Sequence, residues 1–286
     1  MASPPLHYAA FTDTPTGGNP AGVVLDAADM SDAEMLALAA RLAYSESAFL
    51  WPREEEGHYD VRYFSPEAEV PFCGHATIAS GVALAEHQGA GGRLVLHTAS
   101  GLVPVDTSTD EQGHTMATLT SVAPYVESPD PALVTGTLET LGWDPAGLDP
   151  LLAPRVGFAG ARHLILPCRS RDRLADVEYD FEALKALMLA HDLTTVDLVW
   201  REDATTFHAR NLFPVGGVVE DPATGAAAAA FGAYLRTLGA IRPPVELTIF
   251  QGHDMGRPST LTVHVDEAER PELRVSGTAV AMEDAV

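Results

Sequence analysis

The stretch EDPATGAAAAAFGAYL, residues 220–235, decides the fold of this chain. Almost no polar side chain occurs between residues 223 and 235. A helix on a protein surface carries a polar stripe, so a helix that is apolar all round must be enclosed by protein. At 13 residues it is too short to cross a bilayer, which takes roughly 20 residues. The stretch therefore predicts a buried central helix that follows an Asp-Pro turn.

A second helix of the same kind is predicted from FCGHATIASGVALAEH, residues 72–87. Each of the two helices carries two glycines seven positions apart, with a leucine three positions after the second glycine. The two sets are Gly74, Gly81 and Leu84, and Gly225, Gly232 and Leu235. The glycines that open the two helices are 151 residues apart.

The elements before each apolar helix also recur in the same order. A capped helix begins at Ser31, where Glu34 completes a capping box and apolar residues then follow at helical spacing. Residues 47–51 and 59–64 alternate as strands, and a helix at 180–190 precedes strands at 196–200 and 207–213. Trp51 and Trp200 are 149 residues apart, and the next strands carry Arg62 and Arg210, 148 residues apart. Offsets this constant indicate an internal duplication.

The predicted fold class is α+β, with two pseudo-symmetric domains. Each domain is a curved, mostly antiparallel sheet or barrel wrapped around its apolar helix, and runs of small residues let the strands approach that helix closely. We expect the first domain at 1–126 and the second at 127–269. The segment at about 270–286 could complete either barrel.

Composition limits the partners. Lys and Arg total 17 against 40 Asp and Glu, a net charge of −23. This charge argues against a nucleic-acid or anionic-membrane surface, because phosphates would be repelled. The start, MASPPLHYAAF, lacks the pattern of a signal peptide, and no later run reaches transmembrane length. We expect a cytoplasmic protein that binds a small molecule, with no membrane partner.

The sequence contains no recognised pattern for a metal or a cofactor. Cys73 and Cys168 have neither a CxxC nor a Cys/His ligand spacing, and HExxH, P-loop and GxGxxG patterns do not occur. We therefore expect no metal and no cofactor.

The starts of the two apolar helices predict a binding site. The N-terminus of a helix carries unpaired N–H groups and partial positive charge. If the duplicated halves face one another, both helix starts point into one cleft, and a small carboxylate is the ligand that fits.

Four polar side chains stand at or near these helix starts. Glu46, in AYSESAFL, is the candidate general acid/base, because a carboxylate in a semi-closed cleft can exchange protons near neutral pH. His75 is predicted to be neutral, because an imidazolium would oppose the helix dipole. Each of the other residues has a plainer interpretation: Cys73 as a small buried hydrophobe, and Asp221 as the N-cap of a helix that begins at Pro222. Glu46 itself could be a solvated charge at a strand end.

Four motifs together resemble the PhzF family of cofactor-free isomerases: FTDTPTGGNPAGVVLD, SESAF, PFCGHATIASG and VEDPATGAAAAAFGAYL. The resemblance runs nearly end to end and implies a diaminopimelate epimerase-like fold, with an active site between two similar domains and a homodimeric assembly. It also implies that Glu46 moves a proton between two carbons of the substrate, with His75 and Asp221 as site partners. The amides of Gly74, Gly225 and Ala226, beside Cys73, would hold the substrate carboxylate.

Two departures from related enzymes keep alternatives open. Members of the phenazine branch usually carry Ser after DPATG, where this chain has Ala226, so a hydroxyl donor is lost although the backbone N–H is kept. The related racemases use two thiols, but only Cys73 occupies such a position here. The alternatives are a non-catalytic ligand-binding or assembly protein of the same fold, and an epimerase that uses Glu46 with Cys73.

Overall fold

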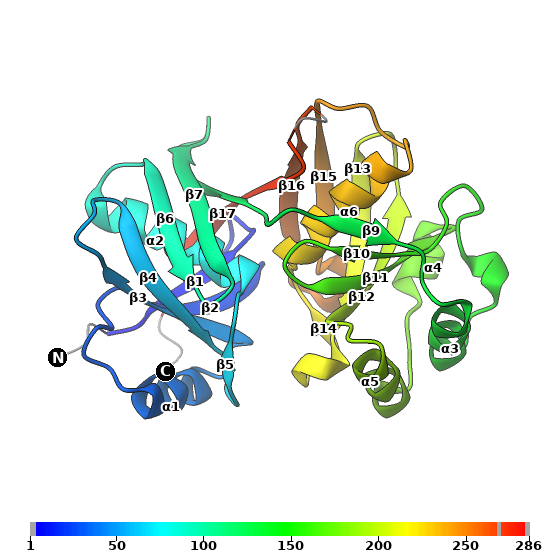
Figure 1. Cartoon of the computed structure of the whole chain (residues 1–286), viewed down its shortest axis with the longest axis horizontal. Helices are drawn as coiled ribbons and strands as arrows, with labels where there is room; N and C mark the ends of the chain where they lie inside the picture. Colours follow the sequence, from blue (N-terminus) through cyan, green and yellow to red (C-terminus); the bar gives the residue numbers. More distant parts are fainter. Residues whose placement is uncertain (1–3, 268–269, 284–286) are drawn as a thin grey trace. The chain divides into compact units, whose positions relative to one another are not determined.

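The computed structural model describes residues 4–267 and 270–283. It divides into two compact units, Met1–Thr120 with Val275–Val286, and Ser121–Arg274 (Figure 1). Each unit is a curved sheet around one apolar helix, so the predicted α+β fold with two similar halves is confirmed.

The first unit is a closed barrel of eight strands. Pairings run from β1 through β2, β3, β4, β6, β7 and β8 to β17, and β17 returns to β1. The strands are β1 Leu6–Ala10, β2 Asn19–Val24, β3 Glu46–Pro52, β4 His58–Phe64, β6 Arg93–Thr98, β7 Gly101–Thr109, β8 Thr115–Thr120 and β17 Arg274–Ala281. The C-terminal segment that the sequence could not assign thus closes this barrel. The short strand β5, Glu69–Val70, pairs antiparallel with the C-terminal end of β4.

Helix α2, Gly74–Gln88, lies inside this barrel, in contact with β1, β2, β3, β7 and β8 (Figure 1). Every residue from His75 to Ala85 is buried, as the apolar pattern predicted. At Gly81 a Cβ atom would lie 2.9 Å from Val105 Cγ1 and 3.0 Å from the Cβ atom of Ala117. The glycine is therefore needed for the close approach of helix and strands. Outside the barrel, α1, Asp32–Leu42, begins with the predicted Ser31–Glu34 capping box.

The second unit repeats this plan. Its pairings run from β9 through β10, β11, β12, β13 and β15 to β16. The short strand β14 pairs antiparallel with the C-terminal end of β13. The strands are β9 Tyr125–Glu127, β10 Arg155–Phe158, β11 Arg162–Cys168, β12 Thr195–Arg201, β13 Thr206–Leu212, β14 Glu220–Asp221, β15 Val245–Gln251 and β16 Ser259–Val265. Helix α6, Gly225–Thr237, contacts β9, β10, β11 and β16. A Cβ atom at Gly232 would lie 2.9 Å from Val263 Cγ1, so this glycine plays the part that Gly81 plays in α2.

Three helices add a second hydrophobic layer to this unit. They are α3 Pro131–Leu141, α4 Arg171–Ala175 and α5 Phe181–Ala190. Their apolar residues pack on one face of the sheet in a cluster that includes Leu138, Leu174, Leu184, Leu166 and Leu198. The sequence predicted α5, but α3 and α4 were not among the predicted elements.

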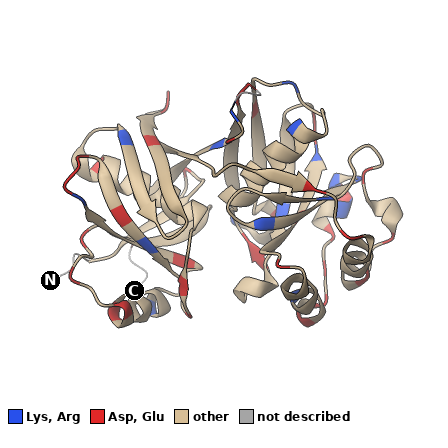
Figure 2. Ribbon diagram, viewed as in Figure 1, with Lys and Arg blue, Asp and Glu red and all other residues tan. Residues whose placement is uncertain are grey.

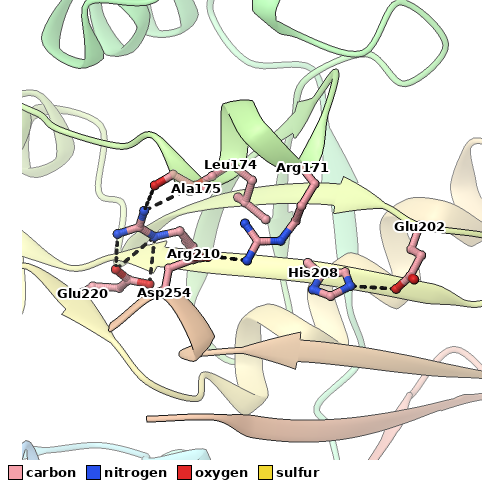
Figure 3. Close-up of polar contacts among 8 residues, drawn as sticks. All are labelled: Arg171, Leu174, Ala175, Glu202, His208, Arg210, Glu220 and Asp254. Atoms are coloured by element: carbon pink, nitrogen blue, oxygen red, sulfur yellow. Dashed lines mark hydrogen bonds and ion pairs between the residues drawn. The ribbon is translucent and has the colours of Figure 1, made fainter. Parts of the chain in front are cut away.

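The duplication extends to strand direction and to one ion pair. The pairs β2–β3 and β4–β6 are parallel in the first unit, as are β11–β12 and β13–β15 in the second. Arg62 of β4 binds Glu69 of β5, with nitrogen and oxygen 2.6 Å apart, and Arg210 of β13 binds Glu220 of β14 at 2.7 Å (Figure 3). The same contact therefore joins equivalent strands of both units.

The charged residues are distributed over both units (Figure 2). Acidic residues outnumber basic ones in the sequence of each unit. Among the described helices, no helix is long and apolar enough to span a membrane.

Candidate active site

In the first unit, three predicted site residues meet at the start of α2. Glu46 is the first residue of β3, Cys73 is the N-cap of α2, and His75 lies in the first helical turn. His75 Nε2 is 3.6 Å from Glu46 Oε2, and His75 Nδ1 is 3.3 Å from Cys73 Sγ. The His75 side chain is 5% exposed and that of Glu46 is 14% exposed, so the carboxylate is the more accessible of the two. Cys73 is buried, as its plainer interpretation predicted.

Two further polar residues hold the imidazole. Asn19, the first residue of β2, places its Nδ2 atom 3.1 Å from His75 Nδ1. The Ser45 hydroxyl donates to Asn19 Oδ1 at 3.4 Å and lies 3.4 Å from His75 Nε2. With the Asn19 oxygen facing the Ser45 hydroxyl and its nitrogen facing His75 Nδ1, this arrangement of the amide corresponds to the neutral tautomer that carries its proton on Nε2. That N–H faces Glu46.

The protonation of His75 follows from its environment. Burial lowers the pKa of His75 from 6.5, while the nearby Glu46 carboxylate and a hydrogen bond to the Pro20 backbone act in the opposite direction. Burial is the largest of the three effects, because the low dielectric of the barrel end penalises the charged ring. This direction agrees with the neutral imidazole that the sequence predicted.

The amides at the start of α2 come before the first intrahelical bond. That bond runs from the Thr77 N–H to the Cys73 carbonyl oxygen, at 3.0 Å, and Cys73 makes no side-chain capping bond. The N–H groups of Gly74, His75 and Ala76 therefore belong to the electropositive first turn. A carboxylate is the complementary group for such a turn.

The second unit gathers its own polar group at the start of α6. The Thr224 hydroxyl donates to Asp221 Oδ2 at 2.5 Å, and Gln251 Nε2 donates to the Asp221 carbonyl oxygen at 2.7 Å. Gln251 Oε1 also accepts from the Thr224 N–H at 3.1 Å. Gln251 thus fixes the turn that leads into the helix, and Asp221 is only 5% exposed.

One prediction at this helix is wrong. Asp221 is not the N-cap and Pro222 is not the first helical residue, because α6 begins at Gly225 and Thr224 is its N-cap. Asp221 lies instead in β14, paired with Asn211 of β13, which keeps the chain extended up to that point. The first turn of α6 contains Gly225, which is buried, and Ala226, which is half-buried.

The structure adds residues that sequence reasoning missed. Asn19 lies in the Gly- and Pro-rich part of FTDTPTGGNPAGVVLD and Ser45 directly precedes Glu46, but neither is among the predicted site residues. A polar residue in a Gly- and Pro-rich turn was the one signal for Asn19. Gln251 had no signal in the sequence, because it reaches Asp221 from 30 residues further along the chain.

The two thiols have different surroundings. Cys168 ends β11, and its sulfur lies 3.8 Å from the Leu166 carbonyl oxygen. Burial raises the pKa of Cys168 to about 12, so this thiol stays protonated at neutral pH. Glu46, Cys73 and His75 each offer one possible metal-ligand atom, and these atoms lie within 4.8 Å of one another.

Comparisons with known proteins identify the family of this chain. A family model described as phenazine biosynthesis-like protein, PhzC-PhzF, matches residues 8–285. The protein named uncharacterized isomerase YfhB of Bacillus subtilis strain 168 is 30% identical over 285 residues, covering 97% of this chain and 96% of that protein. The trans-2,3-dihydro-3-hydroxyanthranilate isomerase of Pseudomonas fluorescens is 29% identical, covering 95% and 94%. The crystal structure of a PhzF-family phenazine biosynthesis protein from Bacillus anthracis superposes with a TM-score of 0.88 at 27% identity, covering 98% of this chain and 96% of that one. The chain therefore belongs to the PhzC-PhzF family of phenazine biosynthesis-like proteins and is an isomerase.

Proposed function

We propose that this isomerase moves a C–H proton from one carbon to another on a small carboxylic acid, without a cofactor, and that Glu46 carries the proton. The observation that supports this most directly is the position of the Glu46 carboxylate, 3.6 Å from the imidazole at the start of α2. A general base must lie within hydrogen-bond reach of the proton it removes. Glu46 is the accessible member of the pair, so it meets a substrate first.

His75 is proposed as the group that orients Glu46 and stabilises charge. Its Nε2–H faces the carboxylate, so it can donate to Glu46 or to a substrate oxygen that becomes negative during proton transfer. A neutral donor is suited to this task, because it does not compete with Glu46 for the proton. The amide of Gly74 is proposed to bind the substrate carboxylate at the first turn of α2.

The second unit supplies three further proposed site residues. Asp221 is held by Thr224 and Gln251 and is proposed to orient the substrate or relay the proton. The first-turn amides of Gly225 and Ala226 are proposed to bind a substrate carboxylate in the same way as that of Gly74. Asp221→Asn should lower the turnover number more than it raises KM if the carboxylate acts in the reaction.

The substrate class follows from this chemistry. The relative in Pseudomonas fluorescens is named for trans-2,3-dihydro-3-hydroxyanthranilate, an amino acid with a ring. We propose that the substrate of this chain is a small carboxylic acid with an acidified C–H. We expect slow turnover of that relative's substrate, because Ala226 lacks a side-chain hydroxyl.

Heavy-water exchange tests the proposal. Wild-type protein is incubated in D₂O with a panel of small carboxylic acids that includes trans-2,3-dihydro-3-hydroxyanthranilate, and NMR follows deuterium entering each C–H position. Glu46→Gln should lower the exchange rate by at least ~100-fold, the scale of a lost general base, with substrate binding nearly intact. Glu54→Gln makes the same change at an exposed position soon after β3 and should leave exchange unaltered. Unchanged exchange in Glu46→Gln would refute the proposal, and exchange on no compound would favour the non-catalytic binding protein.

A second candidate function rests on one contact. Cys73 Sγ lies 3.3 Å from His75 Nδ1, which suits an epimerase that uses Glu46 and a thiol on either side of one carbon. Against it, His75 Nδ1 also faces the Asn19 amide at 3.1 Å, so the thiol shares this nitrogen with a second polar partner. Inactivation by iodoacetamide that substrate prevents would favour this candidate.

Assembly and location remain predictions of the family resemblance. We propose a homodimer in the cytoplasm. Light scattering coupled to size-exclusion chromatography should give about twice the chain mass of 30.3 kDa.

A further inference from the structure

The start of α2 brings together three different metal-binding atoms. Glu46 offers a carboxylate oxygen, Cys73 a sulfur and His75 a ring nitrogen, all within 4.8 Å of one another. Cys73 and His75 are buried and Glu46 is partly exposed, so the group is enclosed on one side and open on the other. In the described part of the chain no other group of three such residues is this close.

The spacing of these atoms fits a tetrahedral ion. Zn–S bonds of ~2.3 Å and Zn–N or Zn–O bonds of ~2.0–2.1 Å at tetrahedral angles place neighbouring ligand atoms roughly 3.3–3.6 Å apart. His75 Nε2 lies 3.8 Å from Cys73 Sγ and 3.6 Å from Glu46 Oε2. The third pair, a Glu46 oxygen and Cys73 Sγ, lies within 4.8 Å, so a movement of about 1 Å would bring all three atoms to bonding geometry around one ion.

The ring nitrogen on the other side has a ready outer partner. A histidine that binds zinc through one nitrogen usually donates its other N–H to an oxygen. His75 Nδ1 faces the Asn19 amide, 3.1 Å away, and the Pro20 backbone also bonds the ring. A rotation of the Asn19 amide would turn its oxygen toward Nδ1, which frees Nε2 for the ion.

The ligand set selects the ion. A thiolate and an imidazole favour Zn²⁺ over Mg²⁺ and Ca²⁺, which prefer oxygen ligands. Three protein ligands leave the fourth position of a tetrahedral zinc ion open, toward the exposed side of Glu46. The protein's net charge of −23 also raises the local concentration of cations.

We propose that Glu46, Cys73 and His75 form a zinc-binding site that plays no part in the cofactor-free chemistry and inhibits the isomerase when zinc is bound. Zinc binding is inferred only from the positions of the three ligand atoms. The inhibition part rests on the proposed function, because zinc would take the carboxylate oxygen that receives the proton and the ring nitrogen that faces it. Zinc would then act as a reversible inhibitor and not as a cofactor.

Cobalt spectroscopy on the full-length chain tests the binding. Co²⁺ in place of Zn²⁺ should give the intense visible bands of a tetrahedral ion together with a thiolate-to-cobalt charge-transfer band. Zn²⁺ added afterwards should abolish both. Cys73→Ser should remove the charge-transfer band and weaken Zn²⁺ affinity by more than ~100-fold, beyond the ~10–100-fold typical of losing an outer partner. Asn19→Ala should fall within that smaller range.

Matched controls separate this site from others. Cys168→Ser removes the second thiol and should leave the charge-transfer band intact. His97→Gln breaks a contact between His58 Nδ1 and His97 Nε2, at 3.0 Å, where a metal could bind without sulfur. It should lower any background binding but not the charge-transfer band. Circular dichroism of each variant checks that the fold is kept.

Each outcome decides one part of the proposal. The zinc site is overturned if wild-type protein gives no charge-transfer band, or if the band survives in Cys73→Ser. Inhibition is measured separately, as heavy-water exchange with Zn²⁺ relative to the same protein with a chelator. A zinc site that forms without slowing exchange would overturn the inhibition alone. If neither added Zn²⁺ nor Glu46→Gln slows exchange, the proposed function is refuted. The cobalt result would not be affected.

Discussion

At the residue scale, the family resemblance implies that one side chain, at position 226, distinguishes this protein from the phenazine branch. Ala226 stands in the first turn of α6 and is half-buried, whereas Ala227, Ala228, Ala229 and Ala230 are all buried. A side chain at this position therefore has partial access to solvent and to any ligand near the helix start. Its identity can change specificity without disturbing the packing of the helix.

Ala226→Ser should test this. A hydroxyl would supply the donor that the resemblance implies for the phenazine branch, so turnover of trans-2,3-dihydro-3-hydroxyanthranilate should rise by roughly 10-fold or more, the value of one hydrogen bond of ~1.4 kcal/mol. The measurement is kcat/KM in the exchange assay. Ala227→Ser, one position on and buried, should not increase it. Equal activity of Ala226→Ser and wild type would show that this position does not set specificity.

A second residue-scale comparison uses the duplicated ion pair. Arg210 and Glu220 are 11% and 3% exposed, and Arg210 also donates to the carbonyl oxygens of Leu174 and Ala175 (Figure 3). Arg62 and Glu69 make the equivalent contact with side chains 27% and 39% exposed. Removing one partner of a buried pair leaves an uncompensated charge, whereas an exposed charge is solvated by water.

Glu220→Gln should therefore lower the free energy of unfolding by about 3 kcal/mol or more, and Glu69→Gln by no more than about 1 kcal/mol. Urea unfolding of both variants measures the two values. Similar losses would mean that burial does not distinguish the two pairs.

At the element scale, three adjacent strands of the second unit share a buried polar chain. His163 of β11 contacts the Thr195 hydroxyl of β12 at 2.7 Å, and that hydroxyl donates to Asn211 Oδ1 of β13 at 2.7 Å. Asn211 Nδ2 in turn donates to Asp197 Oδ1 at 3.0 Å. Burial raises the pKa of Asp197 from 3.8 to about 7, although the bond from Asn211 acts in the opposite direction.

This raised pKa predicts how stability depends on pH. The folded state holds the Asp197 proton more tightly than the unfolded state, so this residue's contribution to the free energy of unfolding falls as pH rises from about 4 to about 7. Above that range the contribution is constant. Asp197→Asn removes the titrating group, so the variant should gain stability relative to wild type across that window.

Thermal unfolding at pH 5 and at pH 8 provides the measurement. The melting temperature of Asp197→Asn minus that of wild type should be more positive at pH 8 than at pH 5. A difference that does not change with pH would report only the cost of a buried amide and would contradict the raised pKa. Asp203→Asn, at an exposed turn, serves as the control.

At the scale of the whole molecule, the last strand completes a barrel that begins at the other end of the chain. β17 pairs with β1, with Ala279 opposite Ala10, and it also pairs with β8. The hydroxyls of Thr118 and Ser276 lie 2.7 Å apart across this second contact. Without β17, both β1 and β8 would expose an unpaired edge.

A chain that ends at residue 273 should therefore lose the cooperative unfolding of the first unit and aggregate. A chain that ends at residue 282 keeps β17 and the bond from the Met282 N–H to the His7 carbonyl oxygen, and it should behave as wild type. Differential scanning calorimetry with light scattering compares the two. Normal unfolding of the shorter chain would show that the barrel does not need its closing strand.

The sequence by itself determined the two apolar helices, the repeated order of elements and the identity of the polar residues around each helix start. These features are local or periodic: a helix without a polar stripe must be enclosed wherever it lies, and a repeat is visible as a constant offset. Only the tertiary structure decided that Asn19 contacts His75, that Glu46, Cys73 and His75 bring their polar atoms within 4.8 Å of one another, and that β17 closes the first barrel. It also excluded Asp221 as the N-cap of α6, because Asp221 pairs with Asn211 in β14 and the helix begins at Gly225. Such contacts depend on strand register between distant segments, and register leaves no periodic signal in a single sequence.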